Sequence, residues 1–140
     1  MKKNTQGGFS LIELLCVVVI IGIVAAIGVP SFQKGIRSAD SGAAFAQLRV
    51  MSSTQMTYFS QHGRFARLNE LNSIQGGGFG SSEGASLVKN RYIYEMSPLE
   101  PTEEELEDGY TIFANEITGV SLTPYVFKVT EKGEITQETP

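Results

Sequence analysis

The chain has 140 residues, 41% of them hydrophobic and 19% charged, a length typical of one ordinary domain, which excludes a multidomain enzyme. Its net charge of −4 gives no reason to expect a nucleic-acid-binding protein. Its single cysteine cannot form an intrachain disulfide, and one histidine with one cysteine falls short of the four ligands of a structural zinc site.

The first predicted element is an apolar helix near the N-terminus. Residues 9–29 form a run of 21 residues interrupted only by Ser10 and Glu13. As an α-helix this run reaches roughly 31 Å, close to the thickness of the hydrocarbon core of a bilayer. Lys2 and Lys3 precede it without any acidic residue, so the positive-inside rule predicts a cytoplasmic N-terminus and an exported C-terminus.

Two simpler interpretations of this segment are a secretory signal peptide and a plain membrane anchor. The signal peptide fits poorly, because no A-x-A-like cleavage site follows the apolar run, which ends in Gly28-Val29-Pro30. The plain anchor leaves Glu13 unexplained, since a carboxylate inside an apolar membrane helix costs about 2.5 kcal/mol or more. Glu13 therefore indicates that the helix has a partner.

The segment GGFSLIELLCVVVIIGIVAAIGVPSF, residues 7–32, resembles the class III signal of the type IV pilin family, which includes the pseudopilins of type II secretion and of competence. The likeness rests on a short basic leader, an apolar helix and five residues at family positions: Gly8, Phe9, Glu13, Gly22 and Pro30.

This resemblance implies that residues 1–8 are a leader peptide, which a prepilin peptidase cleaves between Gly8 and Phe9. It also implies N-methylation of Phe9 and assembly into a helical filament through the apolar helices, on an inner-membrane assembly platform. Glu13 of an incoming subunit is then expected to meet the free amine of Phe9 in the subunit already in the filament.

The physics of residues 9–30 supports a role in assembly. An exposed apolar helix of this length is soluble only in lipid or packed against copies of itself. Gly22 and Ala26 are small residues four positions apart and allow helices to approach closely. Pro30 lacks an amide donor, which predicts a kink or a local opening near Ala26. The family resemblance implies that the stretch from Gly22 to Pro30 loses helical hydrogen bonding in the assembled filament.

Residues 31–60 are predicted to continue the same helix in amphipathic form, ending near Gly63 as a candidate C-cap. We expect an apolar stripe with alternating steps of four and three to pack on a small globular domain: Phe32, Ile36, Ala39, Ala43, Ala46 and Val50. Other apolar side chains surround this stripe: Phe45, Leu48, Met51, Met56 and Phe59.

Residues 61–140 are predicted to form that globular domain. Residues 52–71 resemble the helix end and following loop of small pilins, and the Gly-rich stretch 72–91 reads as a flexible loop. Alternating β-rich segments predict antiparallel strands over residues 91–96, 109–115 and 125–130, with a short closing strand at 134–136. Three or four strands against the long helix give an α+β fold, the roll that the family resemblance also implies.

The lone cysteine marks a departure from the family. Many type IVa major pilins close their C-terminal region with a disulfide, whereas this chain has only Cys16, inside the apolar run. This difference favours a short pilin or a pseudopilin, stabilised in another way. Cys16 itself is interpreted as a small lipid-facing or helix-facing residue, because redox chemistry needs an accessible thiolate.

Catalytic and ligand-binding interpretations lack the necessary residues. The glycines match no phosphate-binding spacing, and His62, with no second histidine, is predicted to be an exposed or capping imidazole at a helix end. The acidic run from Glu100 to Asp108 is predicted to be a solvated loop, with a calcium site as the alternative. Aromatic residues such as Phe45 and Phe59 are assigned to ordinary packing rather than to charge transfer.

The sequence thus predicts a non-enzymatic subunit of a homo-oligomeric, pilus-like filament, without a cofactor or a small-molecule substrate. Before assembly it is expected in the bacterial inner membrane, in contact with lipid, and afterwards in a periplasmic or surface filament that serves adhesion, motility or DNA uptake. Two alternatives stay open: a pseudopilin of type II secretion or competence, and a membrane-anchored binding module that the helix merely tethers.

Overall fold

The computed structural model describes residues 7–117 and 124–138. The chain divides into two compact units, Met1–Ser38 and Ala39–Pro140. Residues 1–6 of the predicted leader, with Lys2 and Lys3, lie outside the described residues.

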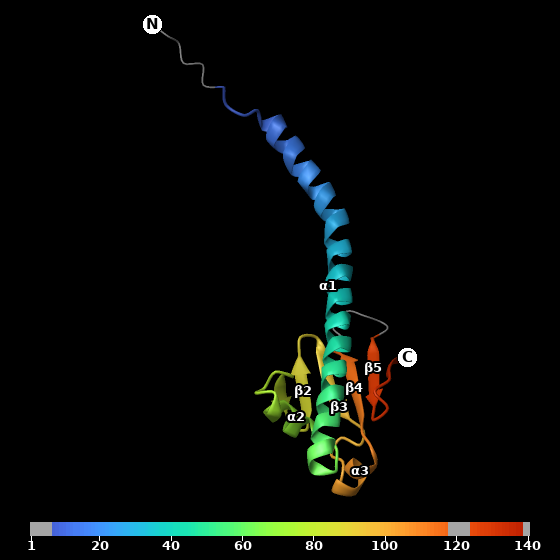
Figure 1. Ribbon diagram of the computed structural model, residues 1–140. Helices are drawn as coiled ribbons and strands as arrows, with labels where there is room; N and C mark the ends of the chain where they lie inside the picture. Colours follow the sequence, from blue (N-terminus) through green and yellow to red (C-terminus); the bar gives the residue numbers. More distant parts are fainter. Residues whose placement is uncertain (1–6, 118–123, 139–140) are drawn as a thin grey trace. The chain divides into compact units, whose positions relative to one another are not determined.

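The longest element is helix α1, Leu11–His62 (Figure 1). Its residues belong to both units. It ends as predicted: Gly63 adopts a φ of +73°, and its N–H donates to the carbonyl of Phe59 at 2.8 Å. Pro30 lies within the helix, which is continuous from residue 22 to residue 30. Of the two predicted alternatives, a kink or a local opening, the opening is absent from this structure, because a single missing donor removes only one bond from a long helical ladder.

The second unit holds one six-stranded sheet in which each strand pairs antiparallel with its neighbour along the chain. Its strands are β1 (Ser81–Glu83), β2 (Ser86–Lys89), β3 (Tyr92–Met96), β4 (Thr111–Glu116), β5 (Val126–Thr130) and β6 (Ile135–Glu138). Two short helices accompany the sheet, α2 (Leu68–Ile74) before β1 and α3 (Glu103–Asp108) between β3 and β4. The predicted α+β class is confirmed.

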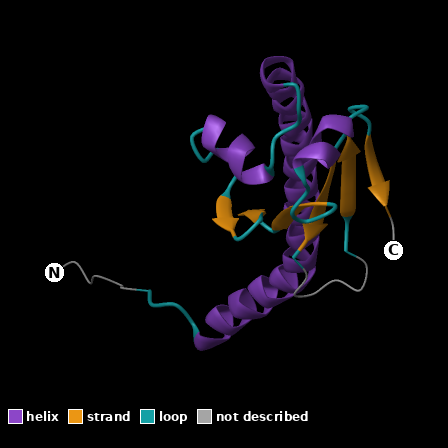
Figure 2. Ribbon diagram, turned by 90° about the horizontal axis from the view of Figure 1, so that it is seen from below, coloured by secondary structure: helices purple, strands orange, loops and turns teal. Residues whose placement is uncertain are grey.

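The core of this unit lies between the sheet and the C-terminal part of α1 (Figure 2). Buried and partly exposed residues alternate along β3, β4 and β5, as expected of strands with one covered face. The register places Tyr94 opposite Ala114 and Ile112 opposite Val129, and all four side chains are buried. Leu48 of α1 belongs to the same core and is fully buried.

The predicted strands from residue 91 onward are present, but the sheet is larger than expected. A hairpin of β1 and β2 occupies the Gly-rich stretch that the sequence predicted to be a flexible loop. Gly84 turns this hairpin with a φ of +64°, and Leu87 of β2 is fully buried. Burial of Leu87 against the core, worth about 1.5–3 kcal/mol, outweighs the low strand propensity of the glycines and serines around it.

The acidic run is also ordered, which corrects the predicted solvated loop. Thr102 caps α3, since its hydroxyl accepts from the N–H of Glu105, while the Glu105 carboxylate accepts from the N–H of Thr102 at 2.8 Å. This reciprocal capping box stabilises a short helix. Leu106, fully buried, fixes α3 to the domain.

The prediction of which face of α1 contacts the domain was wrong. All six residues of the predicted stripe are exposed: Phe32, Ile36, Ala39, Ala43, Ala46 and Val50. Of the surrounding apolar residues, Leu48 and Met51 are buried, whereas Phe45, Met56 and Phe59 are exposed. The face that packs on the domain consists of Ala44, Gln47, Leu48, Met51, Ser52, Gln55 and Tyr58.

Three polar residues explain this error, because an apolar periodicity cannot detect a face that is buried by hydrogen bonding. Gln55 donates to the carbonyl of Ala66 and accepts from its N–H, both at 2.7 Å. Gln47 donates to the carbonyl of Phe79 at 2.7 Å, and the Tyr110 hydroxyl donates to Ser52 at 3.0 Å. These bonds satisfy the buried polar atoms and fix the helix on the domain.

Candidate functional site

The first candidate site is the apolar N-terminal half of α1. Within the described residues, α1 is the one helix long and apolar enough to cross a membrane, and its most apolar stretch has none of its residues buried. Every residue from 9 to 29 is exposed. Such an area exceeds the few hundred Å² of apolar patch that a monomer exposes, so this half of the helix needs lipid or a protein partner.

The predicted processing residues lie just before α1 begins. Gly8 and Phe9 are outside any helix or strand, and 86% of the surface of residue Phe9 is exposed. A Cβ atom at Gly8 would have no atom within 4 Å in this structure. Packing within the chain therefore does not require glycine at this position, and any requirement for it comes from an external partner.

Glu13 lies in the first turn of α1, where a carboxylate interacts favourably with the positive end of the helix dipole. The N–H of Leu14 donates to the carbonyl of Ser10 at 3.1 Å, so the first helical turn is formed around it. Glu13 is exposed and stands four residues after Phe9.

The two remaining predicted residues lie farther along the same helix. Gly22 has open space around its Cα, and Pro30 is exposed within the helix. The structure thus spreads the predicted residues along one apolar rod and does not gather them in a pocket. This arrangement suits contacts that extend along a helix, in contrast to a catalytic site, where side chains converge.

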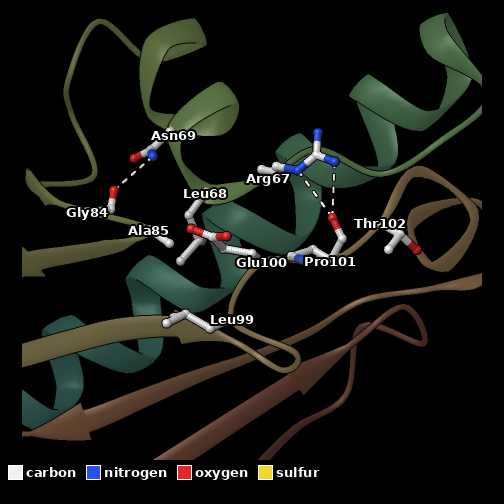
Figure 3. Close-up of a pocket in the computed structure, with 9 residues that line it drawn as sticks. All are labelled: Arg67, Leu68, Asn69, Gly84, Ala85, Leu99, Glu100, Pro101 and Thr102. Carbon is white, nitrogen blue, oxygen red and sulfur yellow. Dashed lines mark hydrogen bonds between the residues drawn. The ribbon is translucent and has the colours of Figure 1, made fainter.

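A cavity of the second unit differs from this rod, because side chains from three segments surround it (Figure 3). It measures about 420 Å³ and lies between α2, the β1–β2 turn and the segment before α3. Arg67 donates from Nε to the carbonyl of Pro101 at 3.2 Å, and Asn69 donates to the carbonyl of Gly84 at 3.0 Å. These side chains brace the walls, and the nine lining residues include one carboxylate, Glu100, but no histidine, cysteine or lysine beside it.

An ionic network stabilises the segment that follows α1. Arg64 donates to both oxygens of Glu70, at 2.8 and 3.0 Å, and its Nε lies 2.6 Å from Glu103. The hydrogen bonds from Arg64 lower the pKa of the Glu70 carboxyl from 4.5 to about 2. The same hydrogen bonds raise the pKa of the Arg64 guanidinium. Since Arg67 also binds Glu103, at 2.7 Å, the network links α2 to α3.

The other residues considered from the sequence carry no chemistry here. His62 stacks on Tyr58 with a centroid distance of 4.0 Å, and its Nδ1 lies 3.1 Å from the Tyr58 carbonyl, so the predicted capping imidazole is confirmed. Cys16 is exposed on the apolar half of α1. Across residues 7–117 and 124–138, no three His, Cys, Asp or Glu side chains are arranged to hold a metal ion.

Comparison with known proteins identifies the N-terminal region. Residues 3–29 match the family described as the prokaryotic N-terminal methylation motif. The chain is 37% identical over 91 residues to the type IV major pilin protein PilA of Myxococcus xanthus, covering 64% of this chain and 36% of that protein. It is 30% identical over 94 residues to the type IV major pilin protein PilE1 of Neisseria gonorrhoeae, covering 67% of this chain and 53% of that protein.

A third relative is the fimbrial protein EcpC of Eikenella corrodens, 38% identical over 63 residues, which cover 45% of this chain and 41% of that protein. The chain thus spans between about a third and a half of the length of these curated relatives. No solved structure matches the chain significantly. The methylation motif and these relatives support the assignment of the chain to the type IV pilin family.

Proposed function

We propose that the protein is a non-enzymatic structural subunit of a type IV pilus-like extracellular filament. The observation that carries this proposal is the methylation motif over residues 3–29, joined to a helix whose apolar half is wholly exposed. Before assembly this half lies in the inner membrane with the N-terminus inside the cell. In the filament it packs against the apolar halves of other copies.

Processing frees the N-terminus that assembly needs. A prepilin peptidase cleaves between Gly8 and Phe9, and the new amine of Phe9 is methylated. The exposure of Phe9 and the open space around Gly8 support this step, because an extended, accessible segment suits an enzyme that must reach the backbone.

Glu13 and the Phe9 amine then form an assembly contact. Both charges are costly in an apolar environment, and unlike charges about 4 Å apart attract by roughly 4 kcal/mol at an effective dielectric constant near 20. Pairing between Glu13 of one copy and Phe9 of the next sets the register between subunits. Gly22 provides a site of close helix approach. Pro30 leaves one backbone carbonyl without its helical donor. We propose that the helix adjusts its hydrogen bonding between Gly22 and Pro30 during assembly.

A pilus subunit is preferred to a pseudopilin of type II secretion or competence because the relatives are named as major pilins and fimbrial proteins. The two functions differ in where the filament is found. A surface filament sheared from cells contains the pilus subunit, whereas a pseudopilus stays within the periplasm.

The test is to shear cells that produce the protein and to examine the released material by electron microscopy with antibodies against residues 39–138. Labelled filaments that vanish when the gene is deleted support the proposal. Protein confined to the periplasm, in short filaments, would indicate the pseudopilin. Protein that stays monomeric in the membrane would contradict both and would favour a tethered binding module.

A further inference from the structure

The part of α1 that belongs to the second unit, residues 39–62, carries apolar side chains on both flanks of its buried face. Three exposed apolar residues each directly precede a buried residue of the helix: Ala43, Ala46 and Val50. Three others each directly follow one: Phe45, Met56 and Phe59. Successive residues are about 100° apart around an α-helix, so a rotation by one residue in either direction presents another apolar series to the domain.

Apolar burial alone does not select the face that is observed. The buried face has four apolar residues: Ala44, Leu48, Met51 and Tyr58. The face that lies one residue further along also has four: Phe45, Leu48, Met56 and Phe59. Two of these are phenylalanines, in place of an alanine and a tyrosine, so the second face offers at least as much apolar surface. Its charged residue, Arg49, has an aliphatic stem that can bring the guanidinium to solvent.

Hydrogen bonds make the selection that apolar burial leaves open. Gln55 is fully buried, and it donates to the carbonyl of Ala66 and accepts from its N–H, both at 2.7 Å. Gln47 donates to the carbonyl of Phe79 at 2.7 Å. Both partners are main-chain groups of buried residues, one in the segment before α2 and one in the turn between α2 and β1. Each bond therefore forms only when its glutamine faces the domain.

Ser52 provides a third restraint, on the other flank of the buried face. Its hydroxyl accepts from the hydroxyl of Tyr110 at 3.0 Å, and the residue is buried. Ser52 follows Gln47 by five residues, which places the two side chains about 140° apart around the helix, with Gln55 between them. A helix that is bonded on both flanks and in the middle of one face resists rotation in either direction.

Rotation by one residue would break these bonds. The N–H and the carbonyl of Ala66 would lose Gln55, and the carbonyl of Phe79 would lose Gln47. Both residues are buried, and buried polar groups without partners are costly. With alanine at positions 47, 52 and 55, these groups lack the same partners in every orientation of the helix. The cost then no longer distinguishes one orientation from another.

We propose that Gln47, Ser52 and Gln55 determine the rotation of α1 about its own axis on the domain. They are positioning residues, because they decide which apolar face is buried and which apolar residues stay at the surface. This inference goes beyond the proposed filament function and does not depend on it, since every contact lies within one chain. A failure of the filament proposal therefore leaves it unaffected.

The test compares two triple variants of the full chain in detergent, both in a Cys16→Ala background. The first combines three exchanges on the buried face: Gln47→Ala, Ser52→Ala and Gln55→Ala. The matched control makes the same three exchanges at exposed positions of α1: Gln33→Ala, Ser53→Ala and Gln61→Ala. Circular dichroism verifies that each protein keeps its helix and sheet.

Single cysteines then report which face of the helix is buried. Ala43 and Ala44 are adjacent residues of the same type, but Ala43 is exposed, whereas only 2% of Ala44 is exposed. In the Cys16→Ala parent and the control, iodoacetamide should label Ala43→Cys at least about a hundredfold faster than Ala44→Cys, because a buried thiol reacts only after local opening. In the first triple variant we expect a ratio below about tenfold, since rotation in either direction moves Ala44 to the edge of the buried face.

A third cysteine, Ala114→Cys, separates rotation of the helix from unfolding of the domain. Ala114 lies in β4 and is fully buried, so unfolding exposes it whereas a rotated helix leaves it covered. Slow labelling of Ala114→Cys, together with the smaller ratio between positions 43 and 44, supports the proposal. An unchanged ratio would overturn it. Fast labelling at all three positions would also overturn it, because the bonds would then serve stability alone.

Single variants keep the test decisive if the triple variant does not fold. Gln47→Ala and Gln55→Ala are then measured separately, each with Ala43→Cys, Ala44→Cys and Ala114→Cys. The expectation is again a smaller ratio between positions 43 and 44 with slow labelling at position 114. A ratio equal to that of the parent in both single variants would contradict the proposal.

Discussion

Glu70→Gln should weaken the folded domain by removing one charge from the network after α1. The Glu70 carboxylate accepts two hydrogen bonds from Arg64, one from the N–H of Arg67 at 2.8 Å and one from the Tyr58 hydroxyl at 3.3 Å. A glutamine keeps the size of the side chain, but it turns an amide group toward the guanidinium of Arg64. The expected result is a lower free energy of unfolding at neutral pH.

The pKa of Glu70 gives the magnitude. A fall from 4.5 to about 2 corresponds to roughly 3.4 kcal/mol at 1.36 kcal/mol per pH unit. Because 33% of the Glu70 side chain surface is exposed, solvent screening reduces this value, and we expect a loss of about 1.5 kcal/mol. The folded state binds the proton less tightly than the unfolded state, so this stability is present above pH 4.5 and disappears as the pH falls toward 2.

Urea unfolding of the full chain in detergent, followed by the circular dichroism of its tyrosines, measures the effect at several pH values. Glu104→Gln is the control, since Glu104 is an exposed carboxylate of α3. We expect the difference between wild type and Glu70→Gln to be largest near pH 7 and to shrink between pH 4.5 and pH 2. Equal stability of the two proteins at pH 7, or a difference that does not change with pH, would refute the reasoning.

Four further predictions concern processing, assembly and the domain. Gly8→Leu should leave uncleaved precursor in the membrane, and immunoblotting that finds only mature protein would contradict this expectation. Glu13→Val should be inserted and cleaved normally, since the helix becomes more apolar, but should yield little or no sheared filament; wild-type yield would exclude the carboxylate from assembly. Gln55→Ala should lower the free energy of unfolding by about 2 kcal/mol, because the N–H and carbonyl of Ala66 lose their buried partners, and unchanged urea unfolding would argue against that role. Residues 34–140 alone should form a soluble α+β monomer. A circular dichroism spectrum of an unfolded or almost wholly helical fragment would contradict the presence of the six-stranded sheet.

The parts of the fold that could be predicted from the sequence are those with strong local patterns. The apolar run and the alternation in Tyr92–Met96 both follow from side-chain periodicity, and the structure places a helix and a strand there. Helix α3 also had a local signal, Thr102 followed three residues later by Glu105. It was missed because the many acidic residues around it favoured the prediction of a solvated loop. The processing residues came from a motif, which no packing within the chain could have indicated.

The remaining features depend on tertiary contacts. Strands β1 and β2 have three and four residues, and the hairpin depends on Leu87 reaching the core. The contact face of α1 depends on Gln47 and Gln55, which look like solvent-facing residues until their backbone partners are known. The exposed series with Ala43 and Ala46 resembles a core stripe in sequence, because apolar periodicity alone does not distinguish a helix face that is covered from one that is exposed.

The most direct test of filament assembly through the N-terminal helix is mass spectrometry of the subunit recovered from sheared surface filaments. The proposal predicts a chain that begins at Phe9, carries one methyl group on its N-terminal amine and lacks residues 1–8. A subunit that still begins at Met1, or a processed chain found only in the membrane and never in filaments, would contradict it.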